Sequence, residues 1–108
     1  GRIDAAAARE TEAYEAWRKS VLGAIEDVEA ALTTVARAKE QRQALQRARG
    51  HAGKALGLAE RRFKAGESSL LDVLDSQRQV IEADSALTSA EALYAGAIVA
   101  LYRALGAY

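Results

Sequence analysis

The sequence contains no cysteine, no proline and a single histidine among its 108 residues. Without cysteine there is no disulfide framework and no thiol redox site. A zinc site needs three or four ligands, so we interpret the lone His51 as a surface or turn residue. No nucleophile–base pair, phosphate loop or metal-binding cluster stands out in the sequence. We therefore predict neither an enzyme nor a cofactor.

Charge of one sign is also missing, because fifteen basic residues balance fifteen acidic ones. A neutral chain provides no overall field for nucleic acid, and the basic stretch over residues 42–54 holds no aromatic side chain that could stack on bases. Neutrality also protects little against self-association, which favours a subunit over a free monomer. The longest apolar runs, such as residues 95–101, are too short to span a bilayer as a helix. We expect no nucleic-acid partner.

Bulky apolar residues are scarce, although half of the sequence is hydrophobic. Of the 54 hydrophobic residues, 26 are alanine, which favours helix but buries little area. Alanine-rich faces let helices approach closely in thin layers. The sequence therefore predicts an all-α chain of long, antiparallel, coiled-coil-like helices, with no strands.

The apolar spacing predicts three helices, over about residues 3–34, 40–64 and 70–105. In the first, Tyr14, Trp17, Val21, Ile25, Val28, Leu32 and Val35 follow steps of three and four, as in a coiled-coil seam. In the last, the main seam is formed by Val80, Ala83, Leu87, Ala90, Tyr94, Ala97, Leu101 and Leu105. Leu74, Ile81, Ile98 and Tyr102 widen it.

Two interruptions separate these helices. A single helix of 60 residues would be a rod about 90 Å long, so we expect the chain to reverse somewhere within residues 33–51. Thr33 and Thr34 could break the helix through their hydroxyls, and Gly50 and Gly53 are the competing break. The second interruption is sharper: Gly66 has the position of a residue that ends a helix with a positive φ, and Ser69 with Asp72 forms a capping-box pattern. Local chemistry allows a reversal or a jog at residues 65–69.

The stretch FKAGESSLLDVLDSQRQ and the words that follow it resemble the outer-membrane efflux protein family, the TolC-like channels. LYRALG, at residues 101–106, resembles the end of the family's helix, and residues 1–32 resemble the long helix after its second membrane hairpin. Phenylalanine stands where the family usually has tyrosine, and no β-hairpin is present. The positions that match the signature are Phe63, Gly66, Leu71, Leu74, Asp75, Gln77 and Arg78.

The resemblance implies a periplasmic helical-barrel segment of a homotrimeric outer-membrane channel in a Gram-negative bacterium. Such a channel is a passive conduit that works with a periplasmic adaptor protein and an inner-membrane pump. It would touch the outer membrane only through strands absent from these residues. On this reading residues 65–69 form an equatorial jog, and the reversal near residues 35–41 forms a periplasmic tip that contacts the adaptor and contributes to gating. The candidate tip residues are Val35, Ala36, Arg37, Lys39 and Gln41.

A second hypothesis stays open at this point. The heptad seams suit a self-contained helical hairpin or bundle that acts as a cytoplasmic interaction scaffold equally well. The small stock of bulky residues argues against a stable lone monomer, because apolar burial must offset more than about 1 kcal/mol of ordering entropy per residue.

Overall fold

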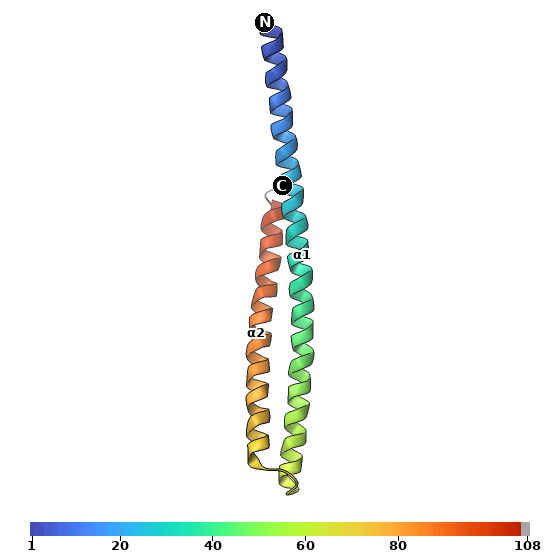
Figure 1. Cartoon of the computed structure of the whole chain (residues 1–108), viewed down its shortest axis with the longest axis vertical. Helices are drawn as coiled ribbons and strands as arrows, with labels where there is room; N and C mark the ends of the chain where they lie inside the picture. Colours follow the sequence, from blue (N-terminus) through green and yellow to red (C-terminus); the bar gives the residue numbers. More distant parts are fainter. Residues whose placement is uncertain (107–108) are drawn as a thin grey trace.

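The structure, a computed structural model, describes residues 1–106. It consists of two helices, α1 (Arg2–Lys64) and α2 (Leu70–Gly106), which lie side by side and antiparallel. Together they form a narrow hairpin with extents of 96 × 15 × 15 Å (Figure 1). Residues 1–106 contain no strand, and the prediction of an all-α chain of long, coiled-coil-like helices is confirmed.

The predicted reversal within residues 33–51 is wrong, because α1 runs through this range without a break. The expected helices over residues 3–34 and 40–64 are therefore one helix of 63 residues. The hydroxyls of Thr33 and Thr34 do not break it. Each donates back to the carbonyl four residues earlier, at 3.1 Å to Glu29 and 3.0 Å to Ala30. A threonine in this arrangement satisfies its hydroxyl inside the helix, at little cost to the backbone ladder.

A regular seam explains why α1 continues through the stretch that is poor in large apolar residues. Its half-buried positions repeat in steps of three and four, and alanine occupies most alternate positions. Small side chains at every second position let α2 approach closely, so the backbone gains contact even where no large residue is present. The half-buried positions of this seam are Val21, Ala24, Val28, Ala31, Val35, Ala38, Arg42, Leu45, Arg49, Ala52, Leu56 and Ala59.

The matching seam of α2 follows the same alternation of larger and smaller residues. Val73, Ala90 and Ala97 are buried, and they are the whole buried core of residues 1–106. Between and beyond them, Ser76, Val80, Ala83, Leu87, Tyr94, Leu101 and Ala104 are half-buried. The predicted main seam of this helix is thus confirmed from residue 80 to residue 101, and Leu105 is exposed at its end.

Two arginines occupy seam positions on α1, and both have partners on α2. The guanidinium of Arg42 lies over the ring of Tyr94, with its Cζ 4.8 Å from the ring centroid. Arg49 donates a hydrogen bond from Nε to the carboxylate of Asp84 and forms an ion pair with it. Polar groups at seam positions fix the register of paired helices, because any slip separates them from their partners. A slip of one helix along the other would therefore break both of these contacts.

The turn between the helices is a Schellman motif. The backbone N–H of Gly66 donates to the carbonyl of Phe63 at 3.0 Å, and that of Glu67 donates to Arg62 at 2.8 Å. This pair of hydrogen bonds closes a helix when the first residue beyond its cap has a positive φ. Gly66 is that residue, and its φ is 76°. The predicted helix-ending role of Gly66 is confirmed.

The interruption at residues 65–69 is the reversal of the chain and not a jog. A jog would place the two helices end to end, whereas α2 returns alongside α1 (Figure 1). The sequence correctly predicts that one helix ends and another begins here. It does not distinguish a reversal from a jog, because both have the same local chemistry. Pairing along the whole length of α2 decides between them, because a collinear arrangement would leave both seams in water.

Candidate interaction surfaces

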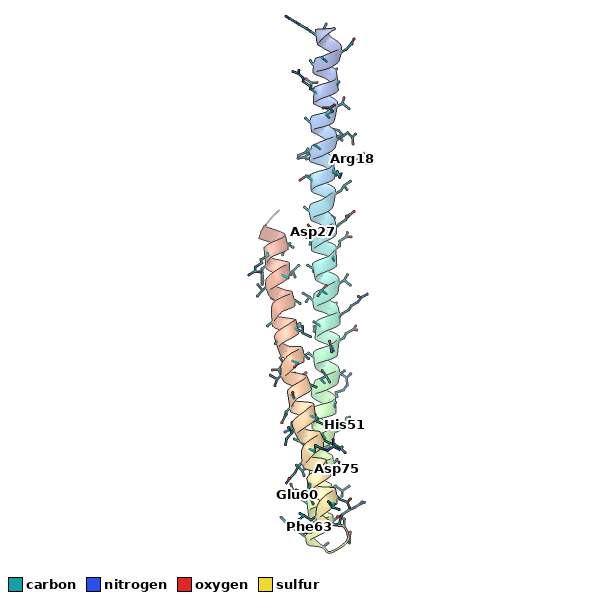
Figure 2. All side chains as sticks on the ribbon, turned by 60° about the vertical axis from the view of Figure 1, so that its left-hand side comes forward. Arg18, Asp27, His51, Glu60, Phe63 and Asp75 are labelled. Carbon is teal, nitrogen blue, oxygen red and sulfur yellow. The ribbon has the colours of Figure 1, made fainter. Side chains whose placement is uncertain are left out.

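No group of three or more metal-ligating side chains comes together within residues 1–106. His51 is exposed on the side of α1 (Figure 2), as predicted for a surface residue. We therefore describe the sites of this chain as surfaces that can contact other helices. Three such surfaces are the closed end of the hairpin, the outer face of α2 and the middle of α1.

The closed end of the hairpin gathers the residues that carry the family signature. Figure 2 shows Phe63 at the turn, with Asp75 on α2 close to this end. Leu71 has 74% of its surface exposed, and Phe63 and Leu74 are also exposed. Gln77 and Arg78 lie within the first three turns of α2, and both are exposed. The turn thus places apolar and polar signature residues together on a solvent-facing end.

A polar network follows this end along α2. Arg78 donates to Asp75 at 2.7 Å and to Glu82 at 2.8 Å, and Gln79 donates to the other oxygen of Asp75 at 2.9 Å. These bonds join Asp75 to residues one turn further along the helix, as side chains three and four positions apart can do. The hydrogen bond from Arg78 lowers the pKa of Asp75 below its ordinary value, and the Asp75 carboxylate raises the pKa of Arg78. The network holds four side chains in one arrangement on an exposed helix surface.

The outer face of α2 carries a second apolar stripe. Leu74, Ile81 and Tyr102 are spaced by multiples of seven, and so are Leu71 and Val99; all five are exposed. A heptad spacing places residues on one face of a helix, and this face is nearly opposite to the seam that contacts α1. We expected the main seam to be widened by Leu74, Ile81, Ile98 and Tyr102. This is wrong for Leu74, Ile81 and Tyr102, which are exposed, whereas Ile98 is half-buried. Their offset from Val73 and Val80 is the signal that separates the two faces.

This division also accounts for the apolar character of α2. By length and composition alone, α2 could cross a membrane, although short apolar runs led us to expect no such helix. Its apolar residues are shared between the face that contacts α1 and the exposed outer stripe. A helix with apolar stripes on two opposite faces is suited to lie between two neighbouring helices.

The predicted tip residues lie in the middle of α1, far along the chain from the turn. Val35 is half-buried in the seam that contacts α2, and Ala36, Arg37, Lys39 and Gln41 are exposed on a continuous helix. The structure does not bring them to an end of the hairpin. The reason for assigning them a tip role, a chain reversal near them, is absent from α1.

Comparisons with known proteins match the chain to one family along almost its whole length. The sequence pattern of the outer membrane efflux proteins matches residues 1–107. The chain is 40% identical to a pyoverdine export outer membrane protein of Pseudomonas putida, and the match covers 98% of this chain and 23% of that protein. No solved structure matches the chain.

Two further relatives agree with this match. Nodulation protein T of Rhizobium leguminosarum bv. trifolii is 36% identical, over 96% of this chain and 22% of that protein. The pyoverdine export outer membrane protein of Pseudomonas aeruginosa is 34% identical, over 95% of this chain and 22% of that protein. The chain thus spans less than a quarter of the length of these relatives. On the extent of the family match, the chain belongs to the outer membrane efflux protein family.

Proposed function

We propose that this hairpin is the periplasmic helical part of an outer-membrane efflux channel. The channel would be a homotrimer and a passive, non-enzymatic conduit that exports solutes from a tripartite pump of a Gram-negative bacterium. The observation that carries the proposal is the family match over residues 1–107. The names of two relatives, which are export outer membrane proteins, support the same activity.

The surface of the hairpin supports a place in a helical wall. Only three residues of the described chain are buried, so the hairpin encloses little of its apolar surface by itself. The outer stripe of α2 offers a second apolar face to a neighbour. A wall one helix thick needs this pattern, since each helix contacts one neighbour on either side.

The closed end of the hairpin then becomes the periplasmic tip. If α1 runs away from the outer membrane, as the family resemblance implies, its end at Lys64 and the turn at residues 65–69 lie farthest from that membrane. We infer that this turn, with the exposed Leu71 beside it, contacts the adaptor protein and through it the inner-membrane pump. Helices that separate near this end would contribute to gating.

A cross-linking experiment on the complete protein tests the location of the tip. A photo-reactive amino acid replaces Glu67 in the turn, and a matched variant carries it at Arg37 in the middle of α1. Both positions are exposed, so the two variants differ in place and not in accessibility. We expect the co-produced adaptor to be captured from position 67 and not from position 37. Capture from position 37 alone would overturn the assignment of the tip to the turn.

Export by cells tests the activity itself. A strain without the gene should accumulate a fluorescent efflux substrate, and the intact gene should restore its export. A Leu71→Asp variant should reach the outer membrane in normal amount but restore export poorly, because a charge on the turn disrupts an apolar contact. Ala36→Asp is the matched control at an exposed position of α1. If deleting the gene leaves the export of every tested solute unchanged, the channel proposal fails.

A further inference from the structure

Three glycines, Gly50, Gly53 and Gly57, lie within one stretch of α1 that runs alongside α2. The backbone does not require any of them, because Gly66 is the only glycine of residues 1–106 with a positive φ. Glycine also weakens the interior of a helix relative to alanine. A structural reason for glycine at one of these positions has to come from what lies beside it.

The space beside Gly53 is occupied by the side chain of Arg49. A Cβ added to Gly53 would lie 2.8 Å from Nη1 of Arg49, so the guanidinium would have to move. The two other glycines differ. A Cβ on Gly50 meets no atom within 4 Å outside the helix backbone, and one on Gly57 lies at an ordinary contact distance of 3.4 Å from Nη1 of Arg61. Of the three glycines, Gly53 alone makes room for a neighbouring side chain.

The direction of the Arg49 side chain explains this close approach. Side chains of a helix lean toward its N-terminus, so each residue covers the turn that precedes it. A side chain at position 53 would therefore lean over Arg49, where Nη1 lies. Glycine leaves this space free, and the guanidinium enters it while Nε donates to the carboxylate of Asp84 on α2. Because Nε and Nη1 belong to one rigid planar group, displacing Nη1 also moves Nε away from the carboxylate.

The other seam arginine, Arg42, has a different residue one turn further along the helix. Gln46 stands there, in the place that corresponds to Gly53. Arg42 lies over the ring of Tyr94, and its buried Nε has no hydrogen-bond partner among residues 1–106. The arginine that is followed by glycine thus makes a directed hydrogen bond across the hairpin, whereas the one followed by glutamine makes a less directional contact with a ring.

We propose that Gly53 is a positioning residue, which keeps open the space that Arg49 needs to reach Asp84 and so helps to select the register of α1 and α2. A heptad seam repeats every seven residues, and many positions of this seam are alanine, so its apolar contacts distinguish poorly between neighbouring registers. The charge pair distinguishes them, because a slip separates Arg49 from Asp84. This role concerns the hairpin alone, so it can fail while the proposed channel function holds, and the reverse is also true.

Chemical modification of arginine in the complete protein tests this role. Phenylglyoxal reacts with guanidinium groups, and mass spectrometry gives the rate at each arginine. Gly53→Ala should make Arg49 react about two- to fivefold faster, the factor that corresponds to the loss of a partly exposed ion pair. Gly57→Ala, at a glycine that is also half-buried, should leave the rate at Arg49 unchanged. No increase in Gly53→Ala, or an equal increase in both variants, would overturn the proposal.

Thermal unfolding of the 108-residue chain shows whether the effect of Gly53→Ala acts through the guanidinium. Gly50→Ala and Gly57→Ala should raise the midpoint of unfolding by about 4–8 °C, because alanine favours helix. Gly53→Ala should raise it less or lower it, since the loss of the ion pair offsets the gain in helix. Lysine keeps the charge but has no atom in the place of Nη1. In an Arg49→Lys background, Gly53→Ala should therefore raise the midpoint as much as the two controls do.

Two results of this experiment would contradict the positioning role. One is a full rise of the midpoint when Gly53→Ala is made beside the native Arg49. The other is a small rise that persists beside lysine, because the effect would then not depend on the guanidinium. If the 108-residue chain does not fold alone, the modification rates in the complete protein still decide the question.

Discussion

The two halves of α1 carry one seam but have different surroundings. From Val21 onward the seam positions of α1 are half-buried, whereas the seam positions from Ile3 to Trp17 present the same spacing to solvent. The covered half uses small side chains, such as Ala31 and Ala38, at alternate positions, while the open half has Trp17, Glu10 and Ile3 there. The comparison shows that the heptad pattern determines which face of a helix is used. The sizes of the side chains on that face indicate which neighbour it accepts.

The largest expected effect on stability comes from a substitution where α2 covers the seam of α1. Ala90 on α2 is 2% exposed, so Ala90→Leu forces a larger side chain between closely spaced helices. We expect a loss of about 1–3 kcal/mol of unfolding free energy. Urea unfolding of residues 1–108, followed by circular dichroism, measures it.

Two substitutions serve as controls for Ala90→Leu. Ala92→Leu, on an exposed position of α2, should change the unfolding free energy by less than about 0.5 kcal/mol. Ala7→Leu, at an exposed seam position near the start of α1, should also be near neutral in this peptide because no described residue covers it. If Ala7→Leu and Ala90→Leu destabilised equally, the two halves of the seam would not differ as described.

The second prediction concerns the turn that closes the covered half. Gly66→Ala forces a side chain into a positive φ of 76°, and we expect it to cost about 1–2 kcal/mol. Gly50→Ala is the matched control, because Gly50 is helical and an added Cβ meets no atom within 4 Å. This control should stabilise α1 by about 1 kcal/mol. Thermal unfolding of both variants checks the opposite signs; the same sign for both would contradict the role of Gly66.

The turn also shows how far the sequence predicts the fold. Gly66 identifies a helix end by its conformation alone, and the steps of the α2 seam identify its buried face; both predictions are confirmed. The place of the reversal could not be predicted in the same way, because alanine and arginine occupy most seam positions of α1 in this stretch and few large apolar residues mark its buried face. Arg42 and Arg49 look solvent-facing in the sequence. Their seam role becomes visible only when Tyr94 and Asp84 lie opposite them.

The third prediction measures one of these contacts across the hairpin. A double-mutant cycle on Arg49→Ala and Asp84→Ala should give a coupling of about 0.2–1 kcal/mol, since both side chains are partly exposed. Salt at 1 M, where screening acts within about 3 Å, should weaken the coupling. The pair Glu15 and Arg18, 3.9 Å apart on the open half, is the within-helix control and should couple less. Zero coupling between positions 49 and 84 would show that this contact does not help to fix the register of the two helices.

The smallest effect should come from the exposed network on the outer face of α2. Because the hydrogen bond from Arg78 lowers the pKa of Asp75 in the folded chain, its stabilisation is present above the ordinary aspartate value near 3.9. It is lost as the pH falls through the lower folded pKa. Helix content of residues 1–108 should therefore fall slightly on acidification below about pH 4. Asp75→Asn should reduce that fall, because it removes the group that titrates. An equal fall in both chains would show that other carboxylates, and not Asp75, carry the acid response.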